Sequence, residues 1–128
     1  TAYFRFSTNS SKFPLDLKYA EELGQAPSDA CKELDEASQI PWVILSAGVN
    51  FDEFVENLKY AVENGSSGFL CGRAIWKEAV GRDDIDAFLL NTGVKRLNQL
   101  VEIAEKNAKP WYKKYVSALS QITIMRGE

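Results

Sequence analysis

Residues 41–80 constrain the fold of this chain more than any other stretch. They read as a strand, a glycine turn, a helix, a second strand, and a second glycine turn that leads into another helix. The two strand candidates, residues 42–45 and 68–71, are almost continuously apolar, as is typical of parallel strands covered on both faces. Apolar strands that alternate with helices predict an α/β fold with a parallel sheet built from βα units.

The two glycine turns are the candidate functional feature of this stretch. Ser46, Ala47 and Gly48 form the first turn, and Gly72 and Arg73 lie in the second. Both turns precede predicted helices, so they can direct backbone N–H groups and one guanidinium toward a single anion. The structural alternatives are that Arg73 pairs with a surface carboxylate and that Ser46 only shapes its turn. The pattern predicts a small-anion site and leaves these alternatives open.

Capping residues delimit the helices around the strands. Ser28 is a good N-cap for a helix over residues 29–38. Asn50 followed by Glu53 three residues later resembles a capping box at the start of the next helix, and Gly65 is suited to end it. One apolar stripe on that helix is formed by Phe51, Phe54, Val55, Leu58, Ala61 and Val62.

The C-terminal part is predicted to be helical. Short helices are expected over residues 74–80 and 83–90, and Gly93 breaks the pattern. Apolar residues then recur at helical spacing from 94 to 115, although Pro110 should kink or interrupt that helix. No linker or repeat is visible, so residues 1–128 are expected to form a single domain.

Composition excludes several classes of function. The net charge of -3 removes bulk attraction for nucleic acid. The chain has no histidine, which excludes Ser-His-Asp and Cys-His catalysis and histidine metal sites within it, and we expect no metal and no cofactor. The two cysteines, Cys31 and Cys71, are interpreted as free thiols, with a disulfide as the alternative. No apolar run approaches a membrane span, and residues 1–13 lack a secretory signal, so a cytoplasmic protein without membrane contact is expected.

Three segments carry a family resemblance: residues 31–38 (CKELDEAS), 41–49 (PWVILSAGV) and 68–80 (GFLCGRAIWKEAV). They resemble the last two βα units of the class I tagatose 1,6-bisphosphate aldolases, a group that includes the sulfofructose-phosphate aldolases. The resemblance extends over residues 13–115. It implies an α/β barrel, which needs about 250 residues. The expected fold is therefore a half TIM barrel, the C-terminal half of a (β/α)8 barrel with parallel strands, βα units and C-terminal helices.

The resemblance also implies an activity and a site. These aldolases cleave a ketose 1,6-bisphosphate to glycerone phosphate and a triose phosphate through a lysine Schiff base. One phosphate is expected to be held by Ser46, Ala47, Gly48, Gly72 and Arg73. The position of the Schiff-base lysine falls at or near Ser10, so Lys12 is a candidate shifted equivalent, and a solvated loop lysine is the alternative.

Two hypotheses follow for the function. The first is a lyase of the aldolase type whose activity needs the strands missing from this chain. The second is a non-catalytic half-barrel that binds a phosphate or sugar phosphate and assembles with another subunit. In either case a homo-oligomer or a second chain is expected to complete the barrel, because open sheet edges and uncovered apolar faces favour association. Whether the chain is itself an enzyme stays open at this stage.

Overall fold

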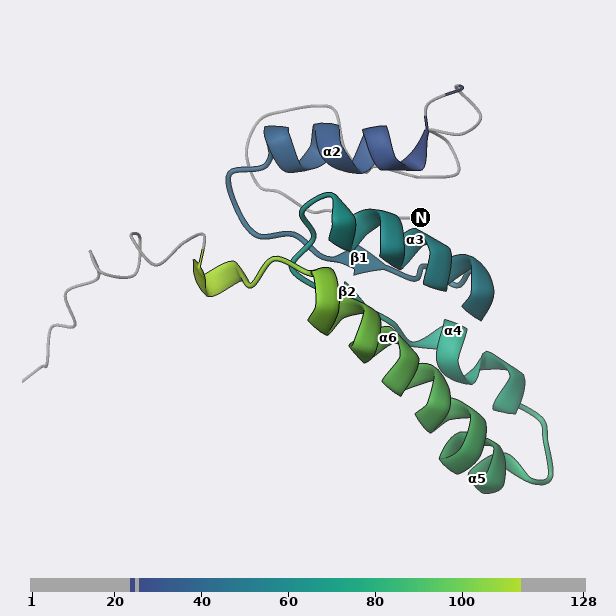
Figure 1. The fold of residues 1–128 in the computed structure, drawn as a ribbon. Coiled ribbons are helices and arrows are strands. Elements are labelled where there is room, and N and C mark those ends of the chain that lie inside the picture. Colours follow the sequence, from purple (N-terminus) through teal and green to yellow (C-terminus); the bar gives the residue numbers. More distant parts are fainter. Residues whose placement is uncertain (1–23, 25, 114–128) are drawn as a thin grey trace, which may run out of the picture.

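The computed structural model describes residues 24 and 26–113, and they form a mostly helical α/β arrangement (Figure 1). The elements in chain order are α2 (Pro27–Ala37), β1 (Ile44–Leu45), α3 (Phe51–Glu63), β2 (Phe69–Leu70), α4 (Arg73–Trp76), a 3₁₀ turn (Lys77–Ala79), α5 (Ile85–Phe88), a π turn (Leu89–Gly93) and α6 (Val94–Asn107). Strands β1 and β2 pair in parallel, with Ile44 opposite Phe69 and Leu45 opposite Leu70. The predicted βαβ order and parallel pairing are confirmed. In the described part the sheet has these two strands, so a half-barrel stays a prediction.

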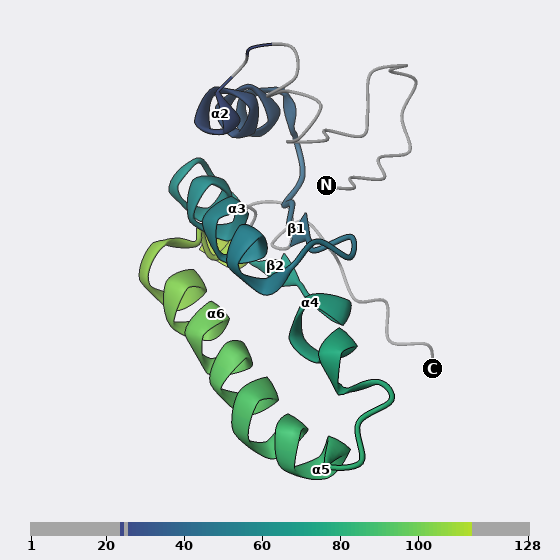
Figure 2. The same ribbon diagram turned by 90° about the vertical axis from the view of Figure 1, so that its right-hand side faces the viewer.

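Helix α3 is the centre of the packing. It lies between α2 and α6 in both ribbon views (Figures 1 and 2), and it also contacts β1 and α4. The predicted apolar stripe is confirmed, because all six of its residues are buried: Phe51, Phe54, Val55, Leu58, Ala61 and Val62. The N-terminal cap is confirmed as well, since the Asn50 side chain accepts a hydrogen bond from the Glu53 N–H at 2.9 Å.

A glycine ends α3, as predicted. Gly65 has φ +112°, and the following Ser66 N–H donates to the Ala61 carbonyl at 2.9 Å, which closes the last turn. A side chain at Gly65 would overlap the carboxylate of Asp35 on α2. That carboxylate accepts hydrogen bonds from Trp42 Nε1 at 2.9 Å and from Lys109 Nζ at 3.1 Å. Asp35 thus joins α2 to the entry of β1 and to the segment after α6.

The predicted cap of α2 was wrong. The helix begins at Pro27, and Ala26 occupies the N-cap position, where its methyl side chain cannot accept a capping hydrogen bond. Proline suits the first helical position because its fixed φ and missing N–H cost nothing there, so the start moves ahead of Ser28. The Ser28 hydroxyl instead meets the end of α3, where Asn64 Nδ2 donates to it at 3.0 Å.

The C-terminal helices depart from the prediction at Gly93. This residue has helical angles, φ -61° and ψ -48°, so α5, the π turn and α6 form one run instead of two helices. The cost of about 1 kcal/mol for glycine inside a helix does not outweigh packing of the run against α3 and α4. The predicted interruption near Pro110 is confirmed, because α6 ends at Asn107 and Ala108 is extended. The predicted helix over residues 74–80 is shorter, with α4 followed by the 3₁₀ turn.

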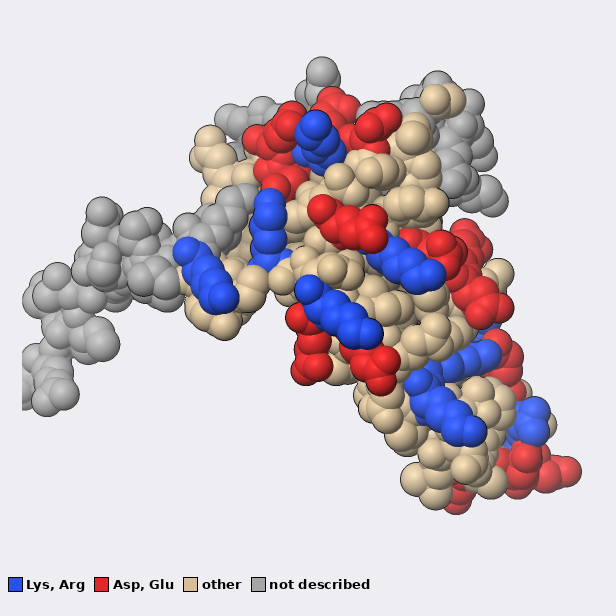
Figure 3. All heavy atoms as spheres, viewed as in Figure 1, with Lys and Arg blue, Asp and Glu red and all other residues tan. Residues whose placement is uncertain are grey.

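Several surface properties bear on function. On the face seen in Figure 3, acidic and basic side chains alternate over α2, α3 and α6, and no continuous basic surface is visible.

Cys31 and Cys71 are free, as predicted. Among the described residues, no helix is long and apolar enough to cross a membrane. In the same part of the chain, no three Asp, Glu, Cys or His side chains are grouped as metal ligands would be.

Candidate anion-binding site

The first predicted turn is a tight reversal directly after β1. The Ser46 N–H continues the sheet by donating to the Leu70 carbonyl at 3.0 Å, and the Val49 N–H closes the turn on the Ser46 carbonyl at 3.0 Å. Between them Ala47 and Gly48 have φ +45° and φ +87°. Positive φ at both central residues is the signature of a type I′ turn. A positive φ is uncommon for alanine, so the turn is held in this shape by its surroundings.

The second turn brings Arg73 onto the first. It is closed by a 2.8 Å hydrogen bond from the Ile75 N–H to the Gly72 carbonyl. The Arg73 guanidinium reaches across to Gly48, where an added Cβ would lie 3.1 Å from its Cζ and 3.1 Å from its Nη2. Two turns 24 residues apart in sequence are therefore in contact through the residues predicted to share an anion. The absence of a side chain at Gly48 is what allows this approach.

The two turns contain backbone N–H groups that are available as hydrogen-bond donors. Within residues 24 and 26–113, the N–H groups of Ala47, Gly48, Gly72 and Arg73 donate to no other protein group. Unpaired N–H groups next to a guanidinium form a surface that suits an anion with several oxygens, such as phosphate. Arg73 is exposed and has no ion-pair partner in the described part of the chain, so the predicted alternative of a surface carboxylate is not seen there.

Ser46 occupies a different position in the site from the other predicted residues. Its side chain is buried, and its hydroxyl forms a hydrogen bond with the thiol of Cys71 on the second turn. Burial raises the pKa of the Cys71 thiol, while the hydrogen bonds from Ser46 and from the Ile75 backbone lower it in part. This contact joins the residue that follows β1 to the residue that follows β2.

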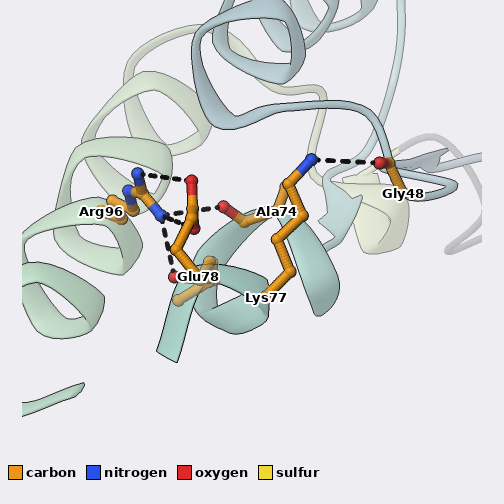
Figure 4. A network of polar contacts seen from close by, with 6 residues as sticks. Gly48, Ala74, Lys77, Glu78 and Arg96 are labelled. Atoms are coloured by element: carbon orange, nitrogen blue, oxygen red, sulfur yellow. Dashed lines mark hydrogen bonds and ion pairs between the residues drawn. The ribbon is translucent and has the colours of Figure 1, made fainter. Parts of the chain in front are cut away.

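The sequence pattern missed a second cation at this site. Lys77, one helical turn after Arg73, lies with its Nζ 3.4 Å from the Gly48 carbonyl oxygen (Figure 4). The i, i+4 spacing of Arg73 and Lys77 would have indicated a shared helical face. It could not have indicated that this face meets the first turn, because that contact depends on the packing of α4 against α3.

A neighbouring ion pair fixes the segment that carries both cations. Arg96 on α6 donates to Glu78 at 2.6 and 3.2 Å and to the carbonyl oxygens of Ala74 and Ile75 at 3.4 and 3.1 Å (Figure 4). These bonds lower the pKa of the Glu78 carboxyl, chiefly through the hydrogen bond with Arg96. The guanidinium also lies 4.9 Å from the centre of the Phe51 ring at the start of α3. The second turn is thus anchored to both α6 and α3.

The described residues leave part of the predicted site untested. Lys12 lies outside residues 24 and 26–113, so its role stays a prediction. The indole Nε1 of Trp76 would lie 3.6 Å from a Cβ added at Gly72, and this residue is 43% exposed. This tryptophan therefore borders the two turns, on the side of Gly72.

Comparison with known proteins identifies relatives of this arrangement. The family model of the DeoC/LacD family aldolases matches residues 11–78, which include both glycine turns and Lys77. Among curated proteins, tagatose 1,6-diphosphate aldolases of Staphylococcus aureus strains JH9, Newman and N315 are each 35% identical to this chain. Each match covers 77% of this chain and 35% of the relative. The chain thus spans about a third of the length of the curated relatives it matches.

Proposed function

The chain belongs to the DeoC/LacD family of aldolases, and from this premise we propose that it holds the phosphate group of a sugar phosphate between its two glycine turns. The proposed ligands are the backbone of Ala47, Gly48 and Gly72 and the guanidinium of Arg73. Ser46 stabilises the first turn, because its carbonyl oxygen accepts the hydrogen bond from the Val49 N–H that closes the turn. The observation that carries the proposal is the contact of the Arg73 guanidinium with Gly48, beside N–H groups that have no protein acceptor in the described residues.

The proposed activity is that of a class I aldolase acting on a ketose 1,6-bisphosphate. In this chemistry a lysine amine adds to the ketone carbonyl and water leaves, which gives a Schiff base. A base then removes the proton of the hydroxyl group on the far side of the breaking carbon–carbon bond, the electron pair of that bond moves into the protonated imine to give an enamine, and the triose phosphate leaves as an aldehyde. Protonation of the enamine carbon and hydrolysis of the imine by water release glycerone phosphate and restore the lysine amine. Binding energy from the phosphate would hold the carbonyl in reach of the amine, which is how a remote group assists a reacting centre.

Lys12 is the proposed nucleophile in this chain. A lysine acts at neutral pH only when burial or a neighbouring cation lowers the pKa of its ammonium group. The family model begins at residue 11, so Lys12 falls inside the matched stretch. The remaining parts of a barrel would supply the apolar surroundings that such a lysine requires, and we propose that the two strands β1 and β2 belong to a half-barrel of this kind.

A specific observation favours the second candidate, a phosphate-binding half-barrel that assembles with another subunit. Leu70 on β2 is 59% exposed, although its strand neighbour Phe69 packs against the core. Three residues of the apolar stripe predicted on the last helix, Val94, Leu97 and Val101, are between 36% and 46% exposed, whereas Leu100 of the same stripe is buried. Faces of this kind are usually covered in an assembled protein. A second copy or another chain would cover them and complete the barrel.

Reductive trapping separates the two candidates. The full 128-residue chain is incubated with dihydroxyacetone phosphate and sodium borohydride, and the adduct is located by peptide mass spectrometry. An adduct on Lys12 that is lost in Lys12→Met supports catalysis. Thermal stabilisation by the phosphate without an adduct supports the binding module. If Arg73→Ala is stabilised by phosphate as strongly as the parent chain, the proposed phosphate site is wrong.

A further inference from the structure

We infer that Lys77 is a second cationic ligand of the bound phosphate and makes the site selective for a phosphomonoester dianion over singly charged anions. The inference rests on the proposed function, because it concerns the same two turns. It adds a residue that neither the sequence pattern nor the family resemblance pointed to.

The first step is geometric. Arg73 and Lys77 approach Gly48 from the same short segment and engage it at different points. The guanidinium lies where a Cβ of Gly48 would be, and the ammonium lies 3.4 Å from the carbonyl oxygen. Two positive groups therefore meet at a single glycine of the first turn. Like charges at i, i+4 repel each other, and a dianion bound between them would remove that repulsion.

The second step concerns the partners of Lys77. An ammonium has three donors, and the contact with Gly48 uses one of them at a distance near the weak end of hydrogen bonding. In the described part of the chain, no carboxylate lies within ion-pair distance of Lys77 or of Arg73. The side chain is half-buried and tethered at its tip, so it needs little movement to meet a ligand on Gly48.

The third step explains why the adjacent carboxylate does not neutralise Lys77. Figure 4 shows the side chains of Lys77 and Glu78 directed to opposite sides, the first toward Gly48 and the second toward Arg96. Arg96 holds Glu78 through both terminal nitrogens, at 2.6 and 3.2 Å. Arg96 thereby keeps the one acidic residue next in sequence to Lys77 away from the two turns. The positive charge of Arg73 and Lys77 is left available for a ligand.

The chemistry of the ligand follows from this charge. One guanidinium suits any oxyanion, whereas two cations favour a ligand with two negative charges. A phosphomonoester carries close to two charges above its second pKa of about 6. A phosphodiester of the same size carries one. The site should therefore discriminate between the two by the charge that Lys77 recognises.

The test compares methyl phosphate with dimethyl phosphate at about pH 8, where the first is a dianion and the second a monoanion. Binding to the full chain is followed by amide NMR, and the Gly48 and Gly72 resonances report on the site. The variants are Lys77→Met, Lys77→Arg and Arg73→Ala. Lys95→Met is the matched control, because Lys95 is an exposed lysine on α6 whose removal changes the net charge equally.

We expect the parent chain to prefer methyl phosphate, and Lys77→Met to weaken methyl phosphate binding by about 10-fold with a much smaller effect on dimethyl phosphate. Lys77→Arg should retain the preference, and Lys95→Met should leave it unchanged. An unchanged preference in Lys77→Met, together with loss of binding in Arg73→Ala, overturns the role of Lys77 and keeps the phosphate site. Equal losses in Lys77→Met and Lys95→Met also overturn it, since they reflect net charge. A parent chain that binds neither ligand overturns the proposed phosphate site along with Lys77.

Discussion

Glu78 and Arg96 form a two-point ion pair that joins the segment after β2 to the last long helix. Both terminal nitrogens of Arg96 contact the carboxylate, and the same guanidinium caps two carbonyl oxygens and covers the Phe51 ring. One side chain thus connects α4, α6 and α3. The position of Arg73 and Lys77 relative to the first turn depends on this connection.

Arg96→Met is expected to lower the free energy of unfolding by about 1–2 kcal/mol, because it removes charged hydrogen bonds and a cation–π contact from a partly buried site. Chemical denaturation of the variant against Lys95→Met measures the effect on a neighbouring, exposed position of the same helix. A loss no larger than that of the control would mean that Arg96 does not anchor the segment.

Glu78→Gln is expected to change how stability depends on pH in acid. The pKa of Glu78 in the folded chain lies below its ordinary value of 4.5, so the stability it contributes is present above pH 4.5 and is lost as pH falls through the folded pKa. The parent chain should lose stability more steeply than Glu78→Gln below about pH 4.5. Denaturation curves at a series of acidic pH values test this, and parallel curves for the two proteins would contradict it.

Gly65→Ala is expected to be more destabilising than Gly81→Ala. Both glycines have positive φ, +112° and +82°, so each substitution costs about 1–2 kcal/mol in backbone strain. An added Cβ has open space at Gly81, whereas at Gly65 it would overlap the Asp35 carboxylate. Moving Asp35 would break its hydrogen bond from the Trp42 indole, so the excess loss should reach about 1–2 kcal/mol. Equal losses of stability in Gly65→Ala and Gly81→Ala, measured by thermal or chemical denaturation, would show that the Asp35 side chain can move aside without cost.

Gly48→Ala should separate stability from binding. The added Cβ would lie 3.1 Å from the Arg73 guanidinium, which is the mobile end of a long side chain and can move aside. The loss of stability should therefore match that of Gly81→Ala, at about 1–2 kcal/mol. Phosphate binding, measured by NMR titration, should fall sharply in Gly48→Ala and stay unchanged in Gly81→Ala. Unaltered phosphate binding in Gly48→Ala would place the anion elsewhere.

The two thiols should differ in reactivity and in their effect on stability. Burial raises the pKa of Cys31 to about 11 from 9.0. Burial also raises the pKa of Cys71, while hydrogen bonds from Ser46 and Ile75 oppose that shift, and Cys71 is less buried than Cys31. Mass-resolved alkylation near neutral pH should label Cys71 before Cys31. For Cys31 the folded pKa exceeds the unfolded one, so its stability contribution is complete below pH 9 and is lost between pH 9 and about 11. Cys31→Ala should flatten that alkaline decline.

The features predicted correctly from the sequence are those that depend on neighbouring residues. The stripe on α3, the cap at Asn50 and the turn at Gly65 follow from periodicity and local backbone preference, and the structure confirms them. The same reasoning failed at Gly93, where helix propensity predicted a break and packing kept the helix intact. It also failed at Ser28, where Pro27 set the start of α2.

The sequence predicted the two turns of the site but not the contacts between them. Their glycines and Arg73 are marked by local sequence, whereas the contacts of Lys77 with Gly48 and of Ser46 with Cys71 join residues that are more than 20 positions apart. Such contacts depend on how α4 packs against α3. The part of the prediction that rests on Lys12 lies outside the described residues.

The hydrogen bond between Asp35 and Lys109 spans 74 positions and joins α2 to the segment after α6. Closing so large a loop costs more chain entropy than forming the βαβ unit that it encloses. During folding, the contacts around α3 should therefore form first, and the hydrogen bond between Asp35 and Lys109 should form last. During synthesis, the segment that carries Asp35 would wait for its partner until almost the whole described chain had emerged from the ribosome.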